Sequence, residues 1–554
     1  MVQFDEDRQK LKINDLLKKE EEELAQLLAS RYGISYIDLL TVAINTDALG
    51  LIKEEDAHRG KLAAFGMVDK KIKVAVLSPK SDTTKEVLTE RGYTTQIFMS
   101  STASLEKAWN TYKDVAFAHE TKAGALEISN QQILEVINQV KSVGDIKKLI
   151  EDLLASNKSY RISKILEIIL AGSLSIGASD VHIEPEEKIV RIRYRLDGVL
   201  TEILTFDSET FGLLLSRIKL LSGLKLNIKQ DAQDGRFSIK LLESDIEIRT
   251  SVLPGAYGES IVLRVLNPKN IAVPLEELGI HPKLLKLLEQ ETERPDGMIL
   301  TTGPTGSGKT TTLYAFLRRV YSPGIKIITI EDPIEYHLPG IVQTQTNDKG
   351  YNFLDGLRSA LRQDPDVIMV GEIRDAETAA IAINSAQTGH LVFSTLHTNN
   401  AAGAFPRLID LKINPKVLTS AINISLAQRL LRKLCIHCKK EVLIEGDAKI
   451  IIDKVIATLP PDERFQLRNT SKMWVPAGCE KCNSTGYKGR IGIYEAILTD
   501  EAVEQVVINN PSEREIKKAA IPQGILTMEQ DGVIKILSGV TALDELARVI
   551  DVTE

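Results

Sequence analysis

The sequence of 554 residues predicts an α/β protein with several domains, and three observations lead to this prediction. The chain is too long for one hydrophobic core, because single cores stop growing near about 300 residues. Short apolar runs typical of strands alternate with helical patterns in residues 31–112 and again from about residue 281. The region between them shows the period-two pattern of β-strands. We therefore expect a doubly wound α/β domain at the C-terminal end, preceded by two smaller domains.

The composition is that of an ordinary globular protein, with 43% apolar and 26% charged residues. The net charge of −7 gives no support for nucleic-acid binding. The N-terminal residues are acidic and lack the basic flank and apolar core of a secretory signal. The most apolar stretch, ILEIILAGSLSIGA, is too short to span a membrane and carries Glu167. We expect a cytoplasmic protein.

The N-terminal region begins with a Lys- and Glu-rich segment that predicts a solvated helix within residues 1–30. The apolar runs KIKVAVLSP and TTQIFMSS then predict strands of a small α/β domain, which we place at 1–125. Charge-mixed helical sequence predicts a linker at 126–158.

A second domain is expected at 159–270. Within EKIVRIRYRLDGVL, apolar residues alternate with three arginines, and this predicts a strand with one apolar and one basic face. QDGRFSIK and DIEIRTSVLPG continue the β pattern, with turns expected at Asp234-Gly235 and at Pro254-Gly255. The two prolines of NPKNIAVPLEELGI indicate the boundary to the C-terminal domain, 271–554.

The C-terminal domain contains a phosphate-binding motif. GPTGSGKT fits G-x-x-x-x-G-K-[ST] at every fixed position, follows an apolar strand at 298–300 and precedes a helical pattern. This context argues against the alternative of a chance glycine-rich turn. Backbone N–H groups of such a loop wrap phosphates at a helix N-terminus, Lys309 reaches the β- and γ-phosphates of ATP, and the Thr310 hydroxyl binds Mg²⁺. The expected nucleotide-binding residues are Gly303, Pro304, Thr305, Gly306, Ser307, Gly308, Lys309, Thr310 and Thr311.

The stretch DVIMVGEIRD carries an acid at each end of an apolar strand. Ligands of doubly wound sheets bind beyond the carboxyl ends of the strands, so Asp366, which precedes the strand, lies at the wrong edge. Glu372 follows the strand, one position after Gly371, where an Asp is usual. Because a Glu can orient and deprotonate a water molecule near a γ-phosphate, we predict Glu372 as the general base.

Two more strands end in polar residues. IKIITI runs into EDPIEY, which places Glu331 and Asp332 at the carboxyl edge, and Glu331 could assist Mg²⁺ or its water shell. HLVFST runs into LHTNN, which places His397 at the same edge, where it could sense the γ-phosphate. For His390, at the other end of that strand, we expect a structural role.

The cysteines occur as two C-x-x-C pairs, Cys435/Cys438 and Cys479/Cys482. Four thiolates are the tetrahedral ligand set that Zn²⁺ prefers, so we predict a structural zinc site in an insert at about 432–488. His437, inside the first pair, is expected to be a bystander. A redox role for the pairs is the alternative.

Together these motifs resemble the type II secretion and type IV pilus assembly ATPases, the GspE/PilB family. GASDVHIEP, RLDGVL, QDGR, GPTGSGKT, IEDPIEY, DPDVIMVGEIRD, STLHTNN and the cysteine pairs carry the resemblance, which covers about 160 to 500. It implies a RecA-like ATPase domain, a preceding PAS-like domain, an N-terminal docking domain and a homohexameric ring. It also implies that Glu331, Glu372 and His397 have the roles given above.

In such rings, arginines of the second domain compensate phosphate charge. Among Arg217, Arg236, Arg249 and Arg264 the resemblance favours Arg217 and Arg236, and a solvated or ion-paired sheet face is the alternative for each. Before QDGR, where relatives often carry a basic residue and then Arg, this chain has Lys229 and Gln230, which puts one contact in doubt. Arg31-Tyr32-Gly33 only partly matches a cyclic-dinucleotide motif of some relatives, and we make no prediction about such a site.

The resemblance implies an ATP-hydrolysing motor that needs ATP, Mg²⁺ and Zn²⁺ and acts on an inner-membrane platform protein of a pilus or secretion machine. Peripheral association with the inner face of the membrane would come through such partners. Three alternatives remain: a pilus retraction ATPase, a hexameric nucleic-acid translocase and a non-catalytic nucleotide-binding scaffold. The low aromatic content, 5%, argues against the translocase. Intact Lys309, Thr310 and Glu372 argue against the scaffold.

Overall fold

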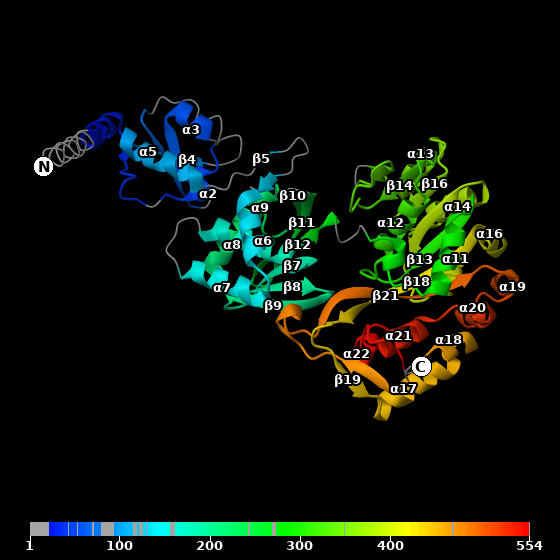
Figure 1. The fold of residues 1–554 in the computed structure, drawn as a ribbon. Coiled ribbons are helices and arrows are strands. Elements are labelled where there is room, and N and C mark those ends of the chain that lie inside the picture. Colours follow the sequence, from blue (N-terminus) through cyan, green and yellow to red (C-terminus); the bar gives the residue numbers. More distant parts are fainter. Residues whose placement is uncertain are drawn as a thin grey trace. The chain divides into compact units, whose positions relative to one another are not determined.

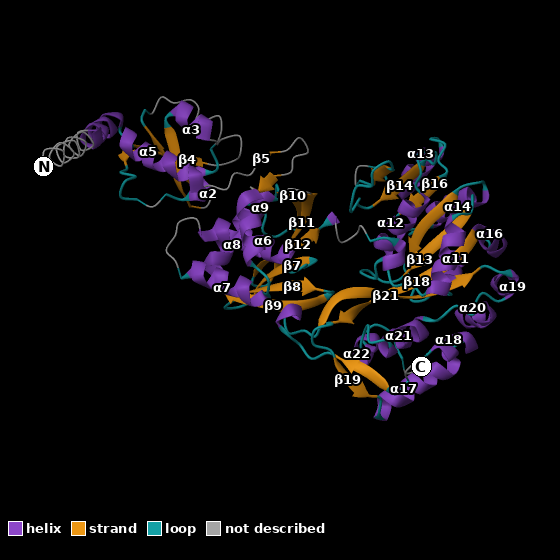
Figure 2. Ribbon diagram, in the orientation of Figure 1, coloured by secondary structure: helices purple, strands orange, loops and turns teal. Residues whose placement is uncertain are grey.

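The computed structural model describes residues 21–552, apart from gaps at 43, 53, 69–70, 79–93, 115–118, 121–125, 129, 156–160, 242–243, 269–272, 348–349 and 468–469. The chain divides into two compact units, Met1–Val265 and Leu266–Glu554. Figures 1 and 2 show the elements of each unit. Of the helix predicted within 1–30, residues 1–20 lie outside the described part, and 21–32 are helical.

The N-terminal part of the first unit contains a four-stranded sheet of order β1-β4-β3-β2. Its strands are β1 (Ser35–Tyr36), β2 (Leu62–Val68), β3 (Lys71–Val76) and β4 (Thr94–Met99), and its helices are α2 (Thr46–Leu49), α3 (Glu54–Gly60) and α5 (Thr102–Asn110). KIKVAVLSP and TTQIFMSS therefore form β3 and β4, as the sequence predicts. Ile72, Val74 and Leu105 belong to the core beside this sheet.

The rest of the first unit contains an eight-stranded sheet of order β5-β6-β10-β11-β12-β7-β8-β9. The strands are β5 (His119–Glu120), β6 (Leu126–Ile128), β7 (Asp180–Pro185), β8 (Val190–Leu196), β9 (Val199–Phe206), β10 (Gln233–Leu241), β11 (Ser244–Gly255) and β12 (Gly258–Leu266). Helices α6 (Asn130–Gln139), α7 (Val143–Leu154), α8 (Arg161–Ser175) and α9 (Ser208–Leu221) accompany it. Ile133 of α6 and Ile146 of α7, from the segment predicted as a linker, belong to the same core as α8 and the sheet.

Strand β8 has the two faces that its sequence predicts. Val190, Ile192 and Tyr194 are fully buried, whereas the arginines between them are partly exposed and form ion pairs such as Arg193 with Glu184. The turn predicted at Asp234-Gly235 is wrong, because both residues lie inside β10 and pair with β11. A Cβ atom on Gly235 would lie 2.3 Å from the carbonyl oxygen of Ser222. This glycine therefore permits a close backbone approach within a strand.

The second unit is built on a seven-stranded sheet of order β15-β14-β16-β17-β13-β18-β21, in which only β21 is antiparallel to its neighbour. The strands are β13 (Gly297–Thr302), β14 (Ile327–Glu331), β15 (Val342–Gln345), β16 (Val367–Val370), β17 (Leu391–Leu396), β18 (Ile422–Leu434) and β21 (Tyr487–Leu498). The helices beside it are α11 (Pro282–Thr292), α12 (Lys309–Val320), α13 (Phe353–Leu361), α14 (Ala376–Gln387), α15 (Ala404–Asp410) and α16 (Pro415–Ala421). The α/β class with a parallel sheet, predicted from the alternating pattern, is confirmed.

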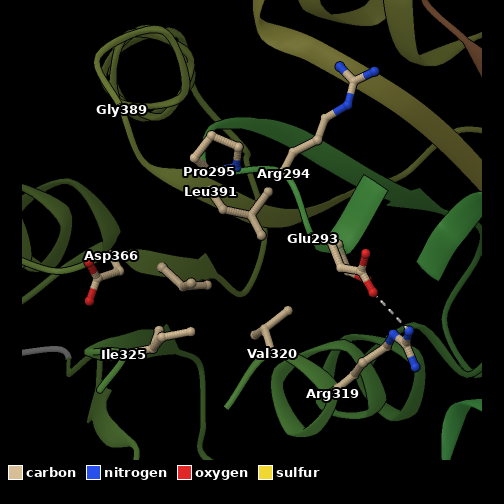
Figure 3. A pocket seen from close by; sticks show the side chains of 11 residues that line it. Glu293, Arg294, Pro295, Arg319, Val320, Ile325, Asp366, Gly389 and Leu391 are labelled. Carbon is tan, nitrogen blue, oxygen red and sulfur yellow. Dashed lines mark hydrogen bonds and ion pairs between the residues drawn. The ribbon is translucent and has the colours of Figure 1, made fainter. Parts of the chain in front are cut away.

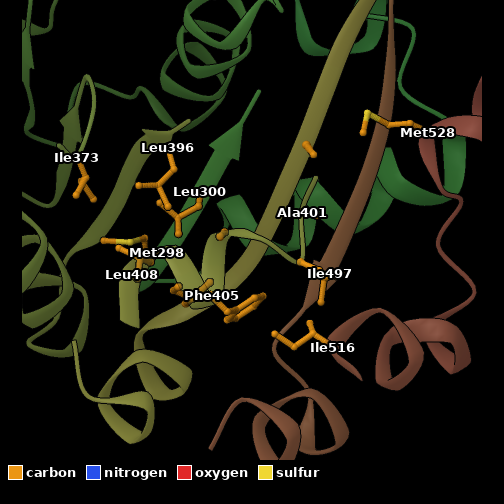
Figure 4. Close-up of a cluster of buried hydrophobic side chains, with 14 of the residues drawn as sticks. Met298, Leu300, Ile373, Leu396, Ala401, Phe405, Leu408, Ile497, Ile516 and Met528 are labelled. Carbon is orange, nitrogen blue, oxygen red and sulfur yellow. The ribbon is translucent and has the colours of Figure 1, made fainter. Parts of the chain in front are cut away.

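Both faces of this sheet are buried, which explains why its strands are continuous apolar runs. Met298 and Leu300 of β13 belong to the core that includes α13, α14 and α15, whereas Ile299 between them belongs to the core that includes α11 and α12. Figure 4 shows Met298 and Leu300 of β13 and Phe405 of α15 among the side chains of the first of these cores. The two cores hold the strand ends in register.

Strands β18 and β21 pair from Ile424–Leu498 to Leu434–Tyr487, and the chain between them makes a long excursion. This excursion contains β19 (Lys440–Leu443), α17 (Gly446–Thr458), α18 (Pro461–Gln466) and β20 (Lys472–Val475), with β19 and β20 paired antiparallel. After β21 follow α19 (Glu501–Asn509), α20 (Glu513–Ala520), α21 (Met528–Leu537) and α22 (Leu543–Ala547). Among the described residues, none of the helices is both long and apolar enough to span a membrane.

Candidate functional site

The phosphate-binding motif forms the connection between β13 and α12. Gly303 leaves the strand with φ 147°, and Gly308 precedes the helix with φ 93°, a conformation that favours glycine. A Cβ atom on Gly303 would lie 2.7 Å from the carbonyl oxygen of Gln428, so the loop has no room for a side chain there. The expected nucleotide-binding residues 303–311 therefore occupy a loop and first helical turn with the shape that a phosphate cradle requires.

Lys309 lies across its own loop. Its Nζ donates to the carbonyl oxygens of Gly303, at 2.7 Å, and Pro304, at 3.1 Å. Burial lowers the pKa of Lys309 below its usual value, the nearby Glu372 carboxylate opposes this shift, and Arg429 adds to it. The ammonium group is thus held at the mouth of the loop.

A cavity of about 140 Å³ opens beside the loop at the carboxyl ends of the parallel strands. Lys309 and Thr310 of the motif line it together with residues that follow β14, β16 and β17. The predicted Glu331, Glu372 and His397 all belong to this lining, as do Asp332, Glu335 and Thr395. The structure therefore brings three separate strand ends to the phosphate loop.

The Glu372 carboxylate has two charged or titratable neighbours. Its Oε2 lies 3.2 Å from Nε2 of His397, and its Oε1 forms an ion pair with the Arg374 guanidinium. The hydrogen bond to Glu372 raises the pKa of Arg374 above its usual value. With 16% of its side chain exposed, Glu372 is oriented by its partners and still open to a water molecule from the cavity.

Glu331 is held differently, in a buried network. It is 3% exposed, and its carboxylate accepts hydrogen bonds from the hydroxyls of Tyr314 and Thr329 and from Nε2 of Gln343. Burial, followed by the charge of Glu331, raises the pKa of Tyr314, which therefore remains a donor. This network fixes the end of β14 against helix α12.

Asp366 lies at the opposite edge of the sheet. Its Oδ2 accepts a hydrogen bond from the backbone N–H of Lys326, at 2.7 Å, before β14 begins. Asp366 lines a separate cavity of about 680 Å³, shown in Figure 3 with Val320, Ile325 and Leu391. His390, also before a strand, lies with Nδ1 3.1 Å from the carbonyl oxygen of Ser385 and outside the lining of the cavity beside the loop.

The candidate arginines lie in the first unit. Arg217 is a half-buried residue of α9, and Arg236 is an exposed residue of β10, directly opposite Arg249 of β11. Arg249 contacts Glu247 at 3.1 Å, and Arg264 contacts Asp180 at 3.0 Å. The two arginines that the resemblance favours less therefore have acidic partners on their own sheet.

The four cysteines converge at the base of the excursion between β18 and β21. Their sulfur atoms all lie within 4.8 Å of one another, with Sγ–Sγ distances of 3.9 Å for Cys435–Cys479, 3.8 Å for Cys438–Cys482 and 3.7 Å for Cys479–Cys482. A tetrahedron with metal–sulfur bonds of about 2.3 Å has edges of about 3.8 Å. A disulfide needs about 2.05 Å. The cluster therefore has the geometry of a zinc tetrathiolate.

The thiol groups of Cys482 and Cys438 differ in their surroundings. The backbone N–H groups of Cys479 and Gly486 lie 3.2 and 3.3 Å from Sγ of Cys482. Burial alone would raise the pKa of Cys482, but these N–H groups, together with hydrogen bonds to Cys479 and Cys438, lower it to about 7. Burial raises the pKa of Cys438 to about 11. The 40 residues between the pairs, a spacing unusual for a zinc ribbon, form the paired strands β19 and β20 and two helices. His437 does not join the sulfur cluster.

Comparison with known proteins agrees with this geometry. A family model described as Type II/IV secretion system protein matches residues 155–548, which is more than half of the chain. The chain belongs to this family.

Two relatives illustrate the extent of the similarity. The type IV pilus assembly ATPase PilB of Myxococcus xanthus is 35% identical over 530 residues, covering 95% of this chain and 91% of the relative. The type II secretion system protein E of Aeromonas hydrophila is 43% identical over 400 residues, covering 72% of this chain and 77% of the relative. The chain is accordingly a secretion ATPase, an ATP hydrolase of the P-loop type, as its motifs predict.

A solved structure shows the shared fold. The X-ray structure of the Yersinia pseudotuberculosis ATPase DotB has a TM-score of 0.50 and 19% identity and covers 72% of this chain and 95% of that chain. At this identity the similarity extends to the fold alone.

Several side chains that hold the site of this secretion ATPase were not predicted from the sequence. Arg374 contacts Glu372, and Tyr314 and Gln343 contact Glu331. For Arg374 a signal existed, because it stands two positions after Glu372 in GEIRD. For Tyr314 and Gln343 no local signal existed, because helix packing and strand pairing bring them to Glu331.

Proposed function

We propose that this secretion ATPase is a cytoplasmic motor that hydrolyses ATP to drive a pilus or secretion machine. The observation that carries the proposal is the convergence of Lys309, Glu372 and His397 on one cavity at the carboxyl edge of the sheet. A cation for the phosphates, an acceptor for the proton of water and a polar group next to it are the parts that phosphoryl transfer to water requires.

The protein's own residues divide the work of hydrolysis. The loop 303–310 and Lys309 bind the phosphates, and Lys309 exchanges its bonds to Gly303 and Pro304 for phosphate oxygens. Glu372 accepts a proton from the attacking water, while Arg374 and His397 fix the orientation of its carboxylate. Glu331 supports this edge from its buried network.

Two metal ions fit the residues present. Thr310 would hold Mg²⁺, which would neutralise phosphate charge when it is bound. The cysteine cluster would bind Zn²⁺ as a structural ion that joins the two ends of the excursion between β18 and β21. An ion bound by four thiolates has no open coordination position for a water molecule, so this site would stabilise the fold and take no part in hydrolysis.

We further propose that the chain acts as a homohexamer, with Arg217 and Arg236 supplying positive charge to the bound nucleotide. The predicted domains at 1–125, 159–270 and 271–554 would serve this arrangement, with α6 and α7 of the segment 126–158 packed in the core of the second. The first would dock to an inner-membrane platform protein at the inner face of the membrane. We propose no nucleic-acid partner for the chain.

Pilus assembly is the first candidate for the machine and type II secretion the second. The similarity to the pilus assembly relative extends over 95% of the chain, whereas that to the Aeromonas relative extends over 72% at higher identity. The match to the pilus assembly relative therefore includes more of residues 1–125, where we place the docking domain.

Phosphate release from ATP by the purified full-length chain tests the ATPase proposal, and mass measurement in solution tests the hexamer. Deleting the gene in its own organism separates the two machines. Loss of surface pili supports assembly, and loss of protein secretion with pili intact supports the second candidate. A wild-type chain that neither binds nor hydrolyses ATP overturns the proposal.

A further inference from the structure

Strand β18 continues past the point where its neighbour β13 turns into the phosphate loop. The pairing between them ends at Thr302–Ala427, so the next residue of β18, Gln428, lies beside the loop rather than beside a strand. Side chains alternate along a strand, and Gln428 shares the face of Ile424 and Leu426, which belong to the core that includes α12. This placement gives Gln428 access to the loop and to the helix that follows it.

The Gln428 side chain makes one hydrogen bond to each of these elements. Its Nε2 donates to the carbonyl oxygen of Ser307, inside the loop, at 2.7 Å. Its Oε1 accepts from the hydroxyl of Thr312, on the first turn of α12, at 2.8 Å. The residue is 1% exposed, so both bonds form away from water, where losing one leaves a buried polar group without a partner.

The fit around Gln428 leaves little space. A Cβ atom on Gly308 would lie 2.9 Å from Nε2 of Gln428, and one on Gly303 would lie 2.7 Å from its carbonyl oxygen. Two glycines of the motif are therefore in close contact with this one residue of β18. Gln428 thus holds the loop backbone, and Lys309, which directly follows the loop, lines the cavity.

We propose that Gln428 is a positioning residue that fixes the phosphate loop in its nucleotide-binding shape through Ser307 and Thr312. It touches neither the phosphates nor the attacking water and acts through the loop backbone. The inference rests on the proposed use of this loop to bind ATP. Because the loop binds phosphate in both ATP and ADP, the positioning affects binding rather than the proton transfer at Glu372.

The neighbouring residue connects the same strand to a second part of the site. Arg429 is buried on the opposite face of β18, and its Nη2 donates to the carbonyl oxygen of Asn399 at 3.0 Å. Asn399 lies two residues after His397. Adjacent residues of β18 therefore hold the phosphate loop and the loop that follows His397, which gives both loops one common support.

The test compares Gln428→Met with wild type in the full-length chain. Methionine keeps nearly the same volume but makes neither hydrogen bond, so it separates packing from positioning. We expect the Kd for a fluorescent ADP analogue and the KM for ATP to rise on the order of 10-fold, with kcat within about 3-fold of wild type. The unfolding temperature without nucleotide should fall by only a few degrees, because two buried polar groups lose a partner while the chain stays folded. Gln387→Met, at an exposed position of α14, is the matched control and should bind as wild type does.

Thr312→Val removes the bond to Oε1 of Gln428 and also the contact of the Thr312 hydroxyl with the Tyr494 side chain. We expect a smaller rise in Kd, and no further rise when Thr312→Val is added to Gln428→Met, because the two residues act through one contact. Should Gln428→Met fail to fold, Thr312→Val becomes the test of the inference. Wild-type affinity for nucleotide in Thr312→Val would then overturn it.

Wild-type Kd and KM in Gln428→Met would overturn the inference, since packing would then suffice. A fall in kcat at unchanged Kd would overturn it as well, because the residue would act on chemistry. A wild-type chain without ATP binding refutes the proposed function instead, before any variant is compared.

Discussion

Nε2 of His397 lies 3.2 Å from Oε2 of Glu372, although the two residues are 25 positions apart in the sequence. Each follows the end of a parallel strand, β17 and β16, and these strands pair in register. The contact therefore marks the edge at which the sheet carries its chemistry, because parallel strands deliver their carboxyl ends to one side.

The first prediction contrasts the two acids at the ends of β16. Glu372→Gln keeps the size of the side chain and removes the proton acceptor, so ATP should still bind while kcat falls by about 100-fold or more. Asp366→Asn, at the other edge, should leave Kd and kcat nearly unchanged, since the Asp366 carboxylate accepts a hydrogen bond from the backbone N–H of Lys326 and does not line the cavity beside the loop. Steady-state phosphate release and nucleotide titration measure both.

Asp366→Asn is a matched control for Glu372→Gln, because each variant removes one negative charge from the same ten residues. If Asp366→Asn were folded and as inactive as Glu372→Gln, the placement of the active edge would be wrong.

The second prediction concerns Lys309. Lys309→Ala removes the cation at the mouth of the loop, so we expect nucleotide affinity to fall by at least 10-fold and turnover to be lost. Lys449→Ala, at an exposed position of α17, removes the same charge elsewhere and should bind nucleotide normally. Titration with labelled nucleotide distinguishes the two, and wild-type affinity in Lys309→Ala would exclude the loop as the phosphate site.

The third prediction concerns the cysteine cluster. Elemental analysis of the purified chain should find about one zinc ion per chain, as a single four-thiolate site requires. Cys479→Ser or prolonged chelation should destabilise the excursion between β18 and β21, because four ligands then no longer join its two ends. Limited proteolysis should show faster cleavage within 435–486 while the first unit remains intact. A native chain free of metal would refute the site.

The fourth prediction concerns pH and the buried Glu167 of α8. It is 4% exposed, burial raises its pKa above the usual value, and Lys164, at 3.1 Å, opposes the shift. Between the unfolded and the folded pKa the native state holds a proton that the unfolded state has lost, so this group's contribution to stability falls as pH rises through that window. Glu167→Gln stays neutral and avoids this loss.

We compare the unfolding temperature of Glu167→Gln with that of wild type at two pH values. The difference, variant minus wild type, should be larger at pH 8 than at pH 5. Calorimetry at both pH values measures the difference. A difference that does not change with pH would mean that Glu167 titrates as an exposed carboxyl does.

Local sequence patterns were sufficient to predict several parts of the site. The phosphate loop needs glycines, a lysine and a threonine at fixed spacing, and the strand before it needs a continuous apolar run, so both could be predicted from the residues alone. The positions of Glu372 and His397 followed from the rule that strands of such a sheet end at one edge. The cysteine pairs predicted a four-thiolate set in the same way.

Which side chains surround these parts depends on long-range packing. Gly235 was predicted in a turn but lies in β10, because a backbone segment 13 residues earlier in the chain passes too close for a side chain. Tyr314 reaches Glu331 through the packing of α12, and Gln428 reaches Ser307 through the pairing of β18 with β13. Such contacts join residues that are distant in sequence, and strand order, register and helix packing set them. No local spacing encodes those quantities, because they depend on how the whole core closes.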